Sequence, residues 1–429
     1  MTNSNRTFIN VKSAKKGKPG TQTILSRLKW NLIALKVIGL LPFYTMRTRH
    51  EIATPTQCRI FIKRVIILSK IIMCILHINA LLSPSIWRML FVQSKTNGLT
   101  ATLDVTFCML CDMTITSTCA FNMDKIIAIL NRFLKIDQFI SELPTSDAAP
   151  QKSFKRTSGN KYIMWMFCYI CLITIPVVHR LFETLSFEIV ILVIAYQLEN
   201  YTSYAFIVFI SSLLHELTMR FQYVNHQIEK YNRKFPKSSE QPNISSPRRL
   251  EHKTTTQDVL NMSRFAENSV VIYSLYNDLL DLLKMVNQLA DLALLSFLLY
   301  SCTGILTCTY SSTLFNFHKR NESFSLMWNV SWIVNFSAVV IVLALRCDRV
   351  TKEANRTSQI LARVYGKGKE YQNIVDKFLS KSIKQDVQFT AYGFFAIDNT
   401  TLFKIFSAVT TYLVILIQFK QLEDSRIDN

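Results

Sequence analysis

Apolar residues along this chain are gathered into long runs, and the segments between the runs are polar and hold most of the charge. A helix needs roughly 20 mostly apolar residues to cross the hydrocarbon core of a bilayer. Seven runs reach that length, and we expect transmembrane helices at residues 62–84, 99–122, 161–179, 187–214, 290–316, 325–347 and 398–419. The pattern therefore predicts an all-α, polytopic membrane protein with seven transmembrane helices.

The positions of Lys and Arg predict the orientation of these helices. If the N-terminus is cytosolic, the inner segments hold 35 Lys and Arg and the outer segments hold 7. The inner segments are 1–58, 123–160, 216–288 and 348–388, and the outer ones are 85–98, 180–186, 317–324 and 420–429. Cytosolic loops carry such a basic excess. We expect a cytosolic N-terminus and an outer C-terminus.

The same distribution explains the formal net charge of +20. The excess is spread over four segments that contain no recognition motif, so its expected partner is the lipid bilayer and not a nucleic acid. No catalytic motif, metal-ligand cluster or phosphate-binding loop is present. We expect neither an enzyme nor a cofactor or metal. The cysteine pairs Cys108/Cys111 and Cys168/Cys171 lie in apolar runs and are expected to pack as free thiols.

The polar segments divide the chain further. Residues 1–58 form an N-terminal cytosolic region, with an amphipathic stretch at Ile33–Leu41 that we expect on the inner membrane surface. Residues 59–347 form a six-helix membrane domain with cytosolic extensions at 123–160 and 216–288. The second extension is helical on both sides of the polar stretch Lys237–Pro247. Residues 348–397 are expected to form cytosolic anchor helices, with one amphipathic helix over 350–385, and 398–429 the last apolar helix and a short tail.

Ionisable and polar residues inside the spans are costly, so each needs a partner or an aqueous face. Lys70 and Asp112 fall at similar depths and are expected to form an ion pair. His77 is expected to pack. Other polar and aromatic residues lie in the outer halves of four helices, and they either join helices or line an outward-facing pocket for a small neutral polar ligand. They are Asp104, the cluster Tyr196–Tyr204, Thr303, Thr307, Thr309, Tyr310, Ser311, Ser312, Asn329, Ser331, Trp332 and Asn335, with His179 near the same level.

The segment Thr410–Phe419 carries the most specific motif. Thr411 and Tyr412 are followed by five apolar residues and then by Gln418 and Phe419, and Ile415, Gln418 and Phe419 fall on one helical face. This motif, with the preceding run Ala391–Asp398, resembles the C-terminal signature of the insect gustatory receptors.

The resemblance implies a tetrameric, ligand-gated, non-selective cation channel, a taste receptor in the plasma membrane of a chemosensory dendrite or a nutrient-sensing cell. It implies that the last helix is split into an anchor half and a pore-lining half. Ile415, Gln418 and Phe419 would form the gate, and Thr411 and Tyr412 would pack the pore helices. The chain would assemble as a homotetramer or as a heterotetramer with related receptors, and would pass monovalent and divalent cations.

The ligand implied by the resemblance is a sugar or polyol, ahead of a bitter plant compound. Thr309–Tyr310, Asn329 and Trp332 look similar to the fructose-type branch of the family, and Thr307 and His179 join the candidate site. The sequence departs from that branch at Val178–Arg180. A polytopic transporter is the alternative class, although the chain shows no internal repeat and no paired Gly or Pro interruptions.

Overall fold

The computed structural model describes nine stretches of the chain, and their residues are helical almost throughout. They are residues 24–41, 45–48, 51–53, 56–84, 95–142, 187–234, 256–314, 322–362 and 388–427. The expected span at 161–179 and the candidate residue His179 lie outside them.

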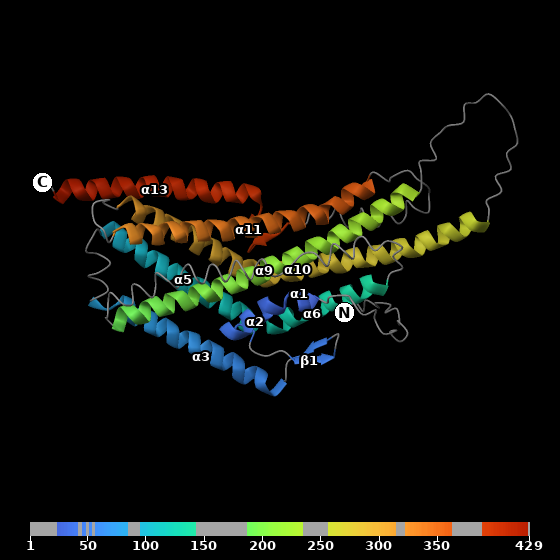
Figure 1. The fold of residues 1–429 in the computed structure, drawn as a ribbon, viewed down its shortest axis with the longest axis horizontal. Helices are drawn as coiled ribbons and strands as arrows, with labels where there is room; N and C mark the ends of the chain where they lie inside the picture. The colour runs from blue at the N-terminus through green and yellow to red at the C-terminus, as the bar shows by residue number, and fades with distance from the viewer. Residues whose placement is uncertain are drawn as a thin grey trace, which may run out of the picture.

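Six long helices dominate this part of the chain (Figure 1). They are α3 (Thr56–Leu81), α5 (Lys95–Phe121), α9 (Phe187–Lys234), α10 (Thr256–Thr313), α11 (Glu322–Ala362) and α13 (Asn399–Ile427). Shorter elements are α1 (Ile24–Arg27), α2 (Lys29–Ile38), α6 (Met123–Glu142) and two antiparallel pairs, β1 (Thr45–Thr48) with β2 (Glu51–Ala53) and β3 (Thr390–Ala391) with β4 (Phe395–Ala396).

Five of the described helices contain segments long and apolar enough to cross a membrane. These segments are Lys95–Phe121, Val190–Lys230, Val271–Thr313, Leu326–Thr357 and Asn399–Ser425. The expected span at 62–84 lies largely within α3. The all-α membrane fold is therefore confirmed, while the count of seven spans and their orientation stay predictions.

The bundle has two distinct ends. At the tip end, on the left in Figure 1, α13 ends and α5 begins. At the base end, on the right, α9 and α11 end and α10 begins. The 58 residues of α10 span about 87 Å at 1.5 Å per residue, far more than a hydrocarbon core of about 30 Å. A helix of this length cannot lie wholly within the membrane, and the cytosolic extensions predicted from the sequence stay predictions.

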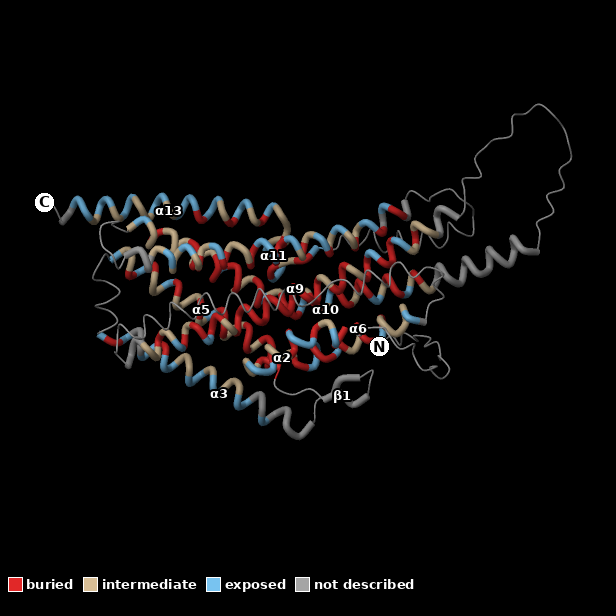
Figure 2. Tube along the Cα trace, in the orientation of Figure 1, coloured by how far each residue is buried: buried red, intermediate tan, exposed pale blue. Residues whose placement is uncertain are grey.

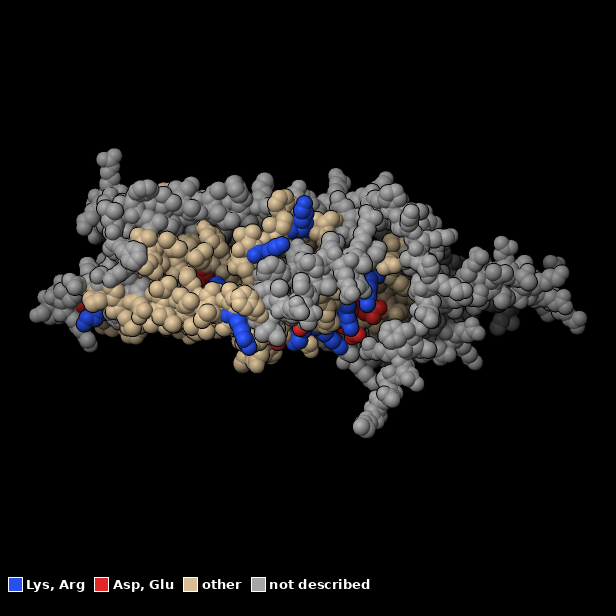
Figure 3. Space-filling model, turned by 90° about the horizontal axis from the view of Figure 1, so that it is seen from below, with Lys and Arg blue, Asp and Glu red and all other residues tan. Residues whose placement is uncertain are grey.

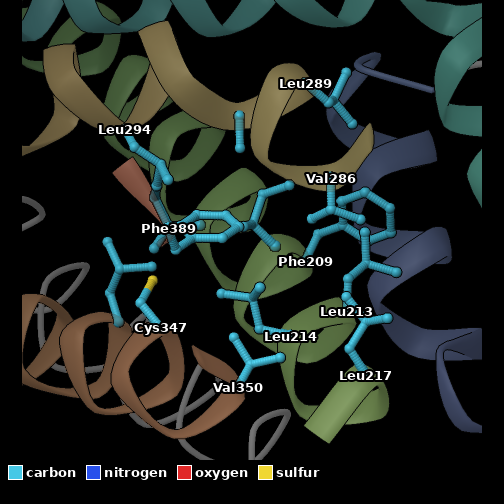
Figure 4. Close-up of a cluster of buried hydrophobic side chains, with 14 of the residues drawn as sticks. Phe209, Leu213, Leu214, Leu217, Val286, Leu289, Leu294, Cys347, Val350 and Phe389 are labelled. Carbon is cyan, nitrogen blue, oxygen red and sulfur yellow. The ribbon is translucent and has the colours of Figure 1, made fainter. Parts of the chain in front are cut away.

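The core of the bundle is formed by α9, against which α2, α3, α5, α10 and α11 pack. Figure 2 shows α9 buried over most of its length, whereas α13 is mostly exposed. Toward the base end, Phe389 lies among apolar side chains of α9, α10 and α11, including Leu214, Val286 and Cys347 (Figure 4). On the face drawn in Figure 3, uncharged side chains cover most of the described surface toward the tip end, and most Lys and Arg lie nearer the base end.

The amphipathic stretch expected on the membrane surface is helical, and part of its apolar face packs against α9. Leu32 and Leu35 of α2 are buried in the protein, and Asn31 donates a hydrogen bond of 2.7 Å to the Ser212 hydroxyl of α9. Part of the apolar face is therefore covered by protein, and the position of this stretch at the membrane surface stays a prediction.

A network of four charges attaches the N-terminal segment to the bundle. Arg220 on α9 contacts Asp137 on α6 at 2.5 Å and Glu216 at 2.8 Å, and Arg27 on α1 contacts the same two carboxylates at 3.2 and 3.1 Å. Burial lowers the pKa of Arg27, although Glu216 and Asp137 oppose that shift. Two arginines and two acids balance in charge, so the buried cluster is neutral as a unit.

Candidate functional site

A Lys–Asp ion pair and a buried His–Glu contact join α3 to its neighbours. The Lys70 ammonium donates to both carboxylate oxygens of Asp112 at 2.8 and 2.9 Å and to the Thr202 hydroxyl at 3.3 Å. This confirms the predicted pairing. About two turns further along α3, His77 Nδ1 lies 2.9 Å from a carboxylate oxygen of Glu199, and both side chains are buried. His77 was expected only to pack, and its spacing of seven residues from Lys70 is the signal that could have suggested a shared polar face.

Nearer the tip end, four polar side chains from three helices form a hydrogen-bonded chain. Tyr196 on α9 donates to Asp104 on α5 at 2.9 Å. The Tyr300 hydroxyl on α10 lies 3.2 Å from the Tyr196 hydroxyl and 2.5 Å from the side-chain amide oxygen of Asn200. The sequence singled out Asp104, Tyr196 and Asn200 as polar residues of this region, but not Tyr300.

Aromatic rings of α11 border this chain. Trp332 meets Tyr196 edge to face, with centroids 6.0 Å apart, and stacks on Phe336 at 5.3 Å. Phe336 in turn meets Tyr300 at 5.1 Å. The close approach of α10 and α11 depends on Gly304, because a Cβ there would lie 2.5 Å from the Phe336 ring. Aromatic pairs of this kind add about 0.5–1.5 kcal/mol each beyond apolar burial.

The other predicted ligand-site residues are distributed unevenly around the cluster. Trp332 and Tyr310 are buried, and Asn329 is partly exposed. The hydroxyl of Thr307 donates to the Thr100 carbonyl at 3.2 Å, and that of Thr309 to the Ile305 carbonyl at 2.7 Å. Both hydroxyls are therefore engaged with backbone, which leaves them less available to hold a ligand.

The C-terminal helix has two unlike faces. A stripe that includes Ile405 and Val409 packs against α10 and α11, whereas most of the helix is exposed. The predicted gate residues all lie on the exposed side. Tyr412 is 59% exposed, Ile415 38% and Phe419 56%, and Thr411 and Gln418 are also exposed.

At each end of α13 a carboxylate accepts two hydrogen bonds. At its start, the Asp398 carboxylate accepts from the Thr401 amide at 2.9 Å and from the Thr400 hydroxyl at 2.7 Å, which caps the helix. Burial raises the pKa of Asp398, but these hydrogen bonds outweigh it and hold the pKa below the ordinary value. At its end, Glu423 accepts from the Lys95 amide at 2.9 Å and the Thr96 hydroxyl at 3.1 Å.

These features define a helical membrane protein with a buried polar and aromatic cluster and an exposed apolar C-terminal helix. A family model described as 7tm Chemosensory receptor matches residues 28–423, and the chain belongs to this family of receptors. The members of the family are receptors and not enzymes.

Relatives and a solved structure agree with this assignment. Over 401 residues the chain is 35% identical to gustatory and pheromone receptor 32a of Drosophila melanogaster, a match that covers 93% of this chain and 86% of that receptor. Over 98 residues it is 66% identical to gustatory receptor 68a of the same fly, covering 23% and 25%. Its fold is similar to that of the insect olfactory receptor OR5 from Machilis hrabei in complex with eugenol, with a TM-score of 0.65, 13% identity and coverage of 91% and 97%.

Proposed function

We propose that this chemosensory receptor is a ligand-gated cation channel whose pore is lined by α13. The observation that carries the proposal is the exposed apolar side of α13, which includes Ile415 and Phe419. A helix that packs one stripe on its own bundle and leaves the other uncovered can meet the same helix of neighbouring chains around an axis. The resemblance noted in the sequence supports four chains, either identical or with related receptors.

The gate in this proposal is a ring of apolar side chains. Four copies of Ile415 and Phe419 would narrow the pore, and a narrow apolar ring excludes hydrated ions by dewetting. Gln418 is exposed between them and would present an amide to water when the helices separate. Thr411 and Tyr412 would pack adjacent pore helices.

Ligand binding at the Tyr196–Trp332 cluster is proposed to open this gate. The cluster involves α5, α9, α10 and α11, and α13 contacts α5, α10 and α11 directly. Moving a pore from 1:99 to 99:1 open requires about 5.5 kcal/mol of differential binding. Divided among four sites this is about 1.4 kcal/mol each, which one or two hydrogen bonds can supply.

The ligand is proposed to be a small molecule with an apolar or aromatic body. The cluster offers the rings of Tyr196, Tyr300 and Trp332, whereas the hydroxyls of Thr307 and Thr309 already bond to backbone. A sugar or polyol, which the sequence favoured, needs several available donors and acceptors and is the second candidate. A receptor named for both taste and pheromones, 35% identical to this chain, supports the broader class.

The site and gate are proposed to work at the surface of a sensory cell, with the tip end outside, as the Lys and Arg distribution predicts. The test is single-channel recording of the purified chain in a planar bilayer while apolar odorants, bitter compounds and sugars are added. We expect unitary cation currents that appear with ligand and vanish on washout. Ligand-dependent flux without unitary steps would instead indicate a transporter.

A further inference from the structure

Asp104 is unlike the other buried acids of the membrane region. The residue is 8% exposed, one carboxylate oxygen accepts the Tyr196 hydroxyl at 2.9 Å, and the other is buried with no hydrogen-bond partner among the described residues. Asp112 is paired with Lys70 and Glu199 with His77. In the part of the chain that the structure describes, no Lys, Arg or His forms an ion pair with Asp104.

An unpaired carboxylate at membrane depth is costly, and such residues commonly serve function. Replacing Asp104 by Asn would keep the hydrogen bond to Tyr196 and remove the cost of the charge. The acid is thus not required for the contact it makes. Its second oxygen is an acceptor for a group that the described residues do not supply.

The surroundings of Asp104 indicate what that group is. The aromatic side chains of the cluster are Tyr196, whose hydroxyl Asp104 accepts, Tyr300, which is hydrogen-bonded to Tyr196, and Trp332, which packs on Tyr196. Aromatic faces attract cations through the ring quadrupole, and more strongly when the site is desolvated. A carboxylate flanked by electron-rich rings suits an organic cation far better than a neutral polyol or an anion.

We propose that the ligand of the Tyr196–Trp332 cluster is a protonated amine on an apolar body, with Asp104 as its counter-ion. The proposal rests on the proposed function, since it assigns a ligand class to the same site. Because the free oxygen of Asp104 is closed off from solvent, an ammonium group reaches it only after neighbouring side chains move. Binding is thereby tied to a conformational change, as ligand gating requires.

The experiment measures binding directly, on the purified full-length chain in nanodiscs. The probes are matched pairs in which a tertiary amine and its uncharged carbon isostere share one aromatic body, such as N,N-dimethylphenethylamine and isoamylbenzene, together with glucose and fructose. The variants are Asp104→Asn and, as a control on the same helix, Thr102→Val, whose hydroxyl donates to the Gly98 carbonyl at 2.8 Å. Thermal unfolding verifies that each variant is folded.

We expect the amines to bind at least 10-fold more tightly than their isosteres. Asp104→Asn should weaken amine binding by about 10- to 100-fold, the lower part of the range measured for close charge pairs. Asp104→Asn should leave isostere binding unchanged, and Thr102→Val should leave both unchanged. The proposal is wrong if no amine in the panel binds better than its isostere, or if Asp104→Asn retains the preference.

Failure of the ligand proposal can be distinguished from failure of the channel proposal. Amines that bind through Asp104 without evoking unitary currents would contradict the channel proposal alone. Currents evoked by sugars or neutral odorants, unchanged in Asp104→Asn, would contradict the ligand proposal alone.

Discussion

Glu423 near the end of α13 accepts hydrogen bonds from Lys95 and Thr96, so the tip of the exposed helix is bonded to the first turn of α5. The bonded residues are 328 and 327 positions apart in the chain. The contact places a carboxylate against the amide-bearing N-terminus of α5, where the helix dipole favours negative charge. Since α5 also carries Asp104, the contact connects the ligand cluster to the proposed pore helix.

The first prediction follows from this contact. Glu423→Ala should weaken the unliganded arrangement by about 1 kcal/mol per chain, because it removes two partly exposed hydrogen bonds to a charged group. We expect higher ligand-free open probability and a dose–response curve shifted to lower concentration. Patch-clamp recording checks this, with Asp424→Asn as control because Asp424 bonds Lys420 one turn away on the same helix. An unaltered curve for Glu423→Ala would remove the contact from gating.

The second prediction concerns the Lys70–Asp112 pair. Lys70→Met or Asp112→Leu alone leaves an uncompensated buried charge, which costs about 3–5 kcal/mol in proteins. Each single variant should lower the amount of folded protein at the membrane. The double variant should recover part of it, because no charge is then stranded. Thermal stability and surface labelling measure the effect, and losses that simply add in the double variant would contradict a direct pairing.

The third prediction concerns the contact between α10 and α11. Gly304→Ala places a methyl group 2.5 Å from the Phe336 ring. We expect a loss of about 1–3 kcal/mol in the free energy of unfolding, as for other overpacked sites. Phe336→Leu combined with Gly304→Ala should restore part of the loss. If Gly304→Ala unfolds at the same temperature as the parent, the helices are not as close as described.

Much of this architecture could be predicted from the sequence. The length of the apolar runs indicated the membrane helices. The similar depths of Lys70 and Asp112 within their runs identified the ion pair, because run length and depth both follow from position along the sequence. The Asp104–Tyr196–Tyr300 chain could not be derived in full, since it depends on the rotation of three helices about their axes. The use of Leu32 and Leu35 against α9 was also missed, because an amphipathic pattern does not say whether lipid or protein covers its apolar face.

The fourth prediction tests the apolar ring. Phe419→Ala or Ile415→Ser should raise cation conductance in the absence of ligand, because a wider and more polar ring no longer dewets. Gln418→Ala should change ion selectivity or unitary conductance without a large leak. Whole-cell currents in ligand-free solution, normalised to surface expression, measure both effects. Three silent and well-expressed variants would place the gate elsewhere.

The central claim is that the exposed side of α13 faces a water-filled pore. The most direct measurement is thiol modification during single-channel recording, with cysteine introduced at Ile415 and, as the matched control, at Leu416, which is less exposed on the adjacent side of the helix. The unsubstituted chain shows how far the reagent changes the current through the native cysteines alone. The account predicts that a positively charged methanethiosulfonate reagent reduces unitary current in Ile415→Cys when ligand is present, and has little effect in Leu416→Cys or the parent. Equal and unhindered currents in all three, with modification verified by mass spectrometry, would contradict a pore lined by α13.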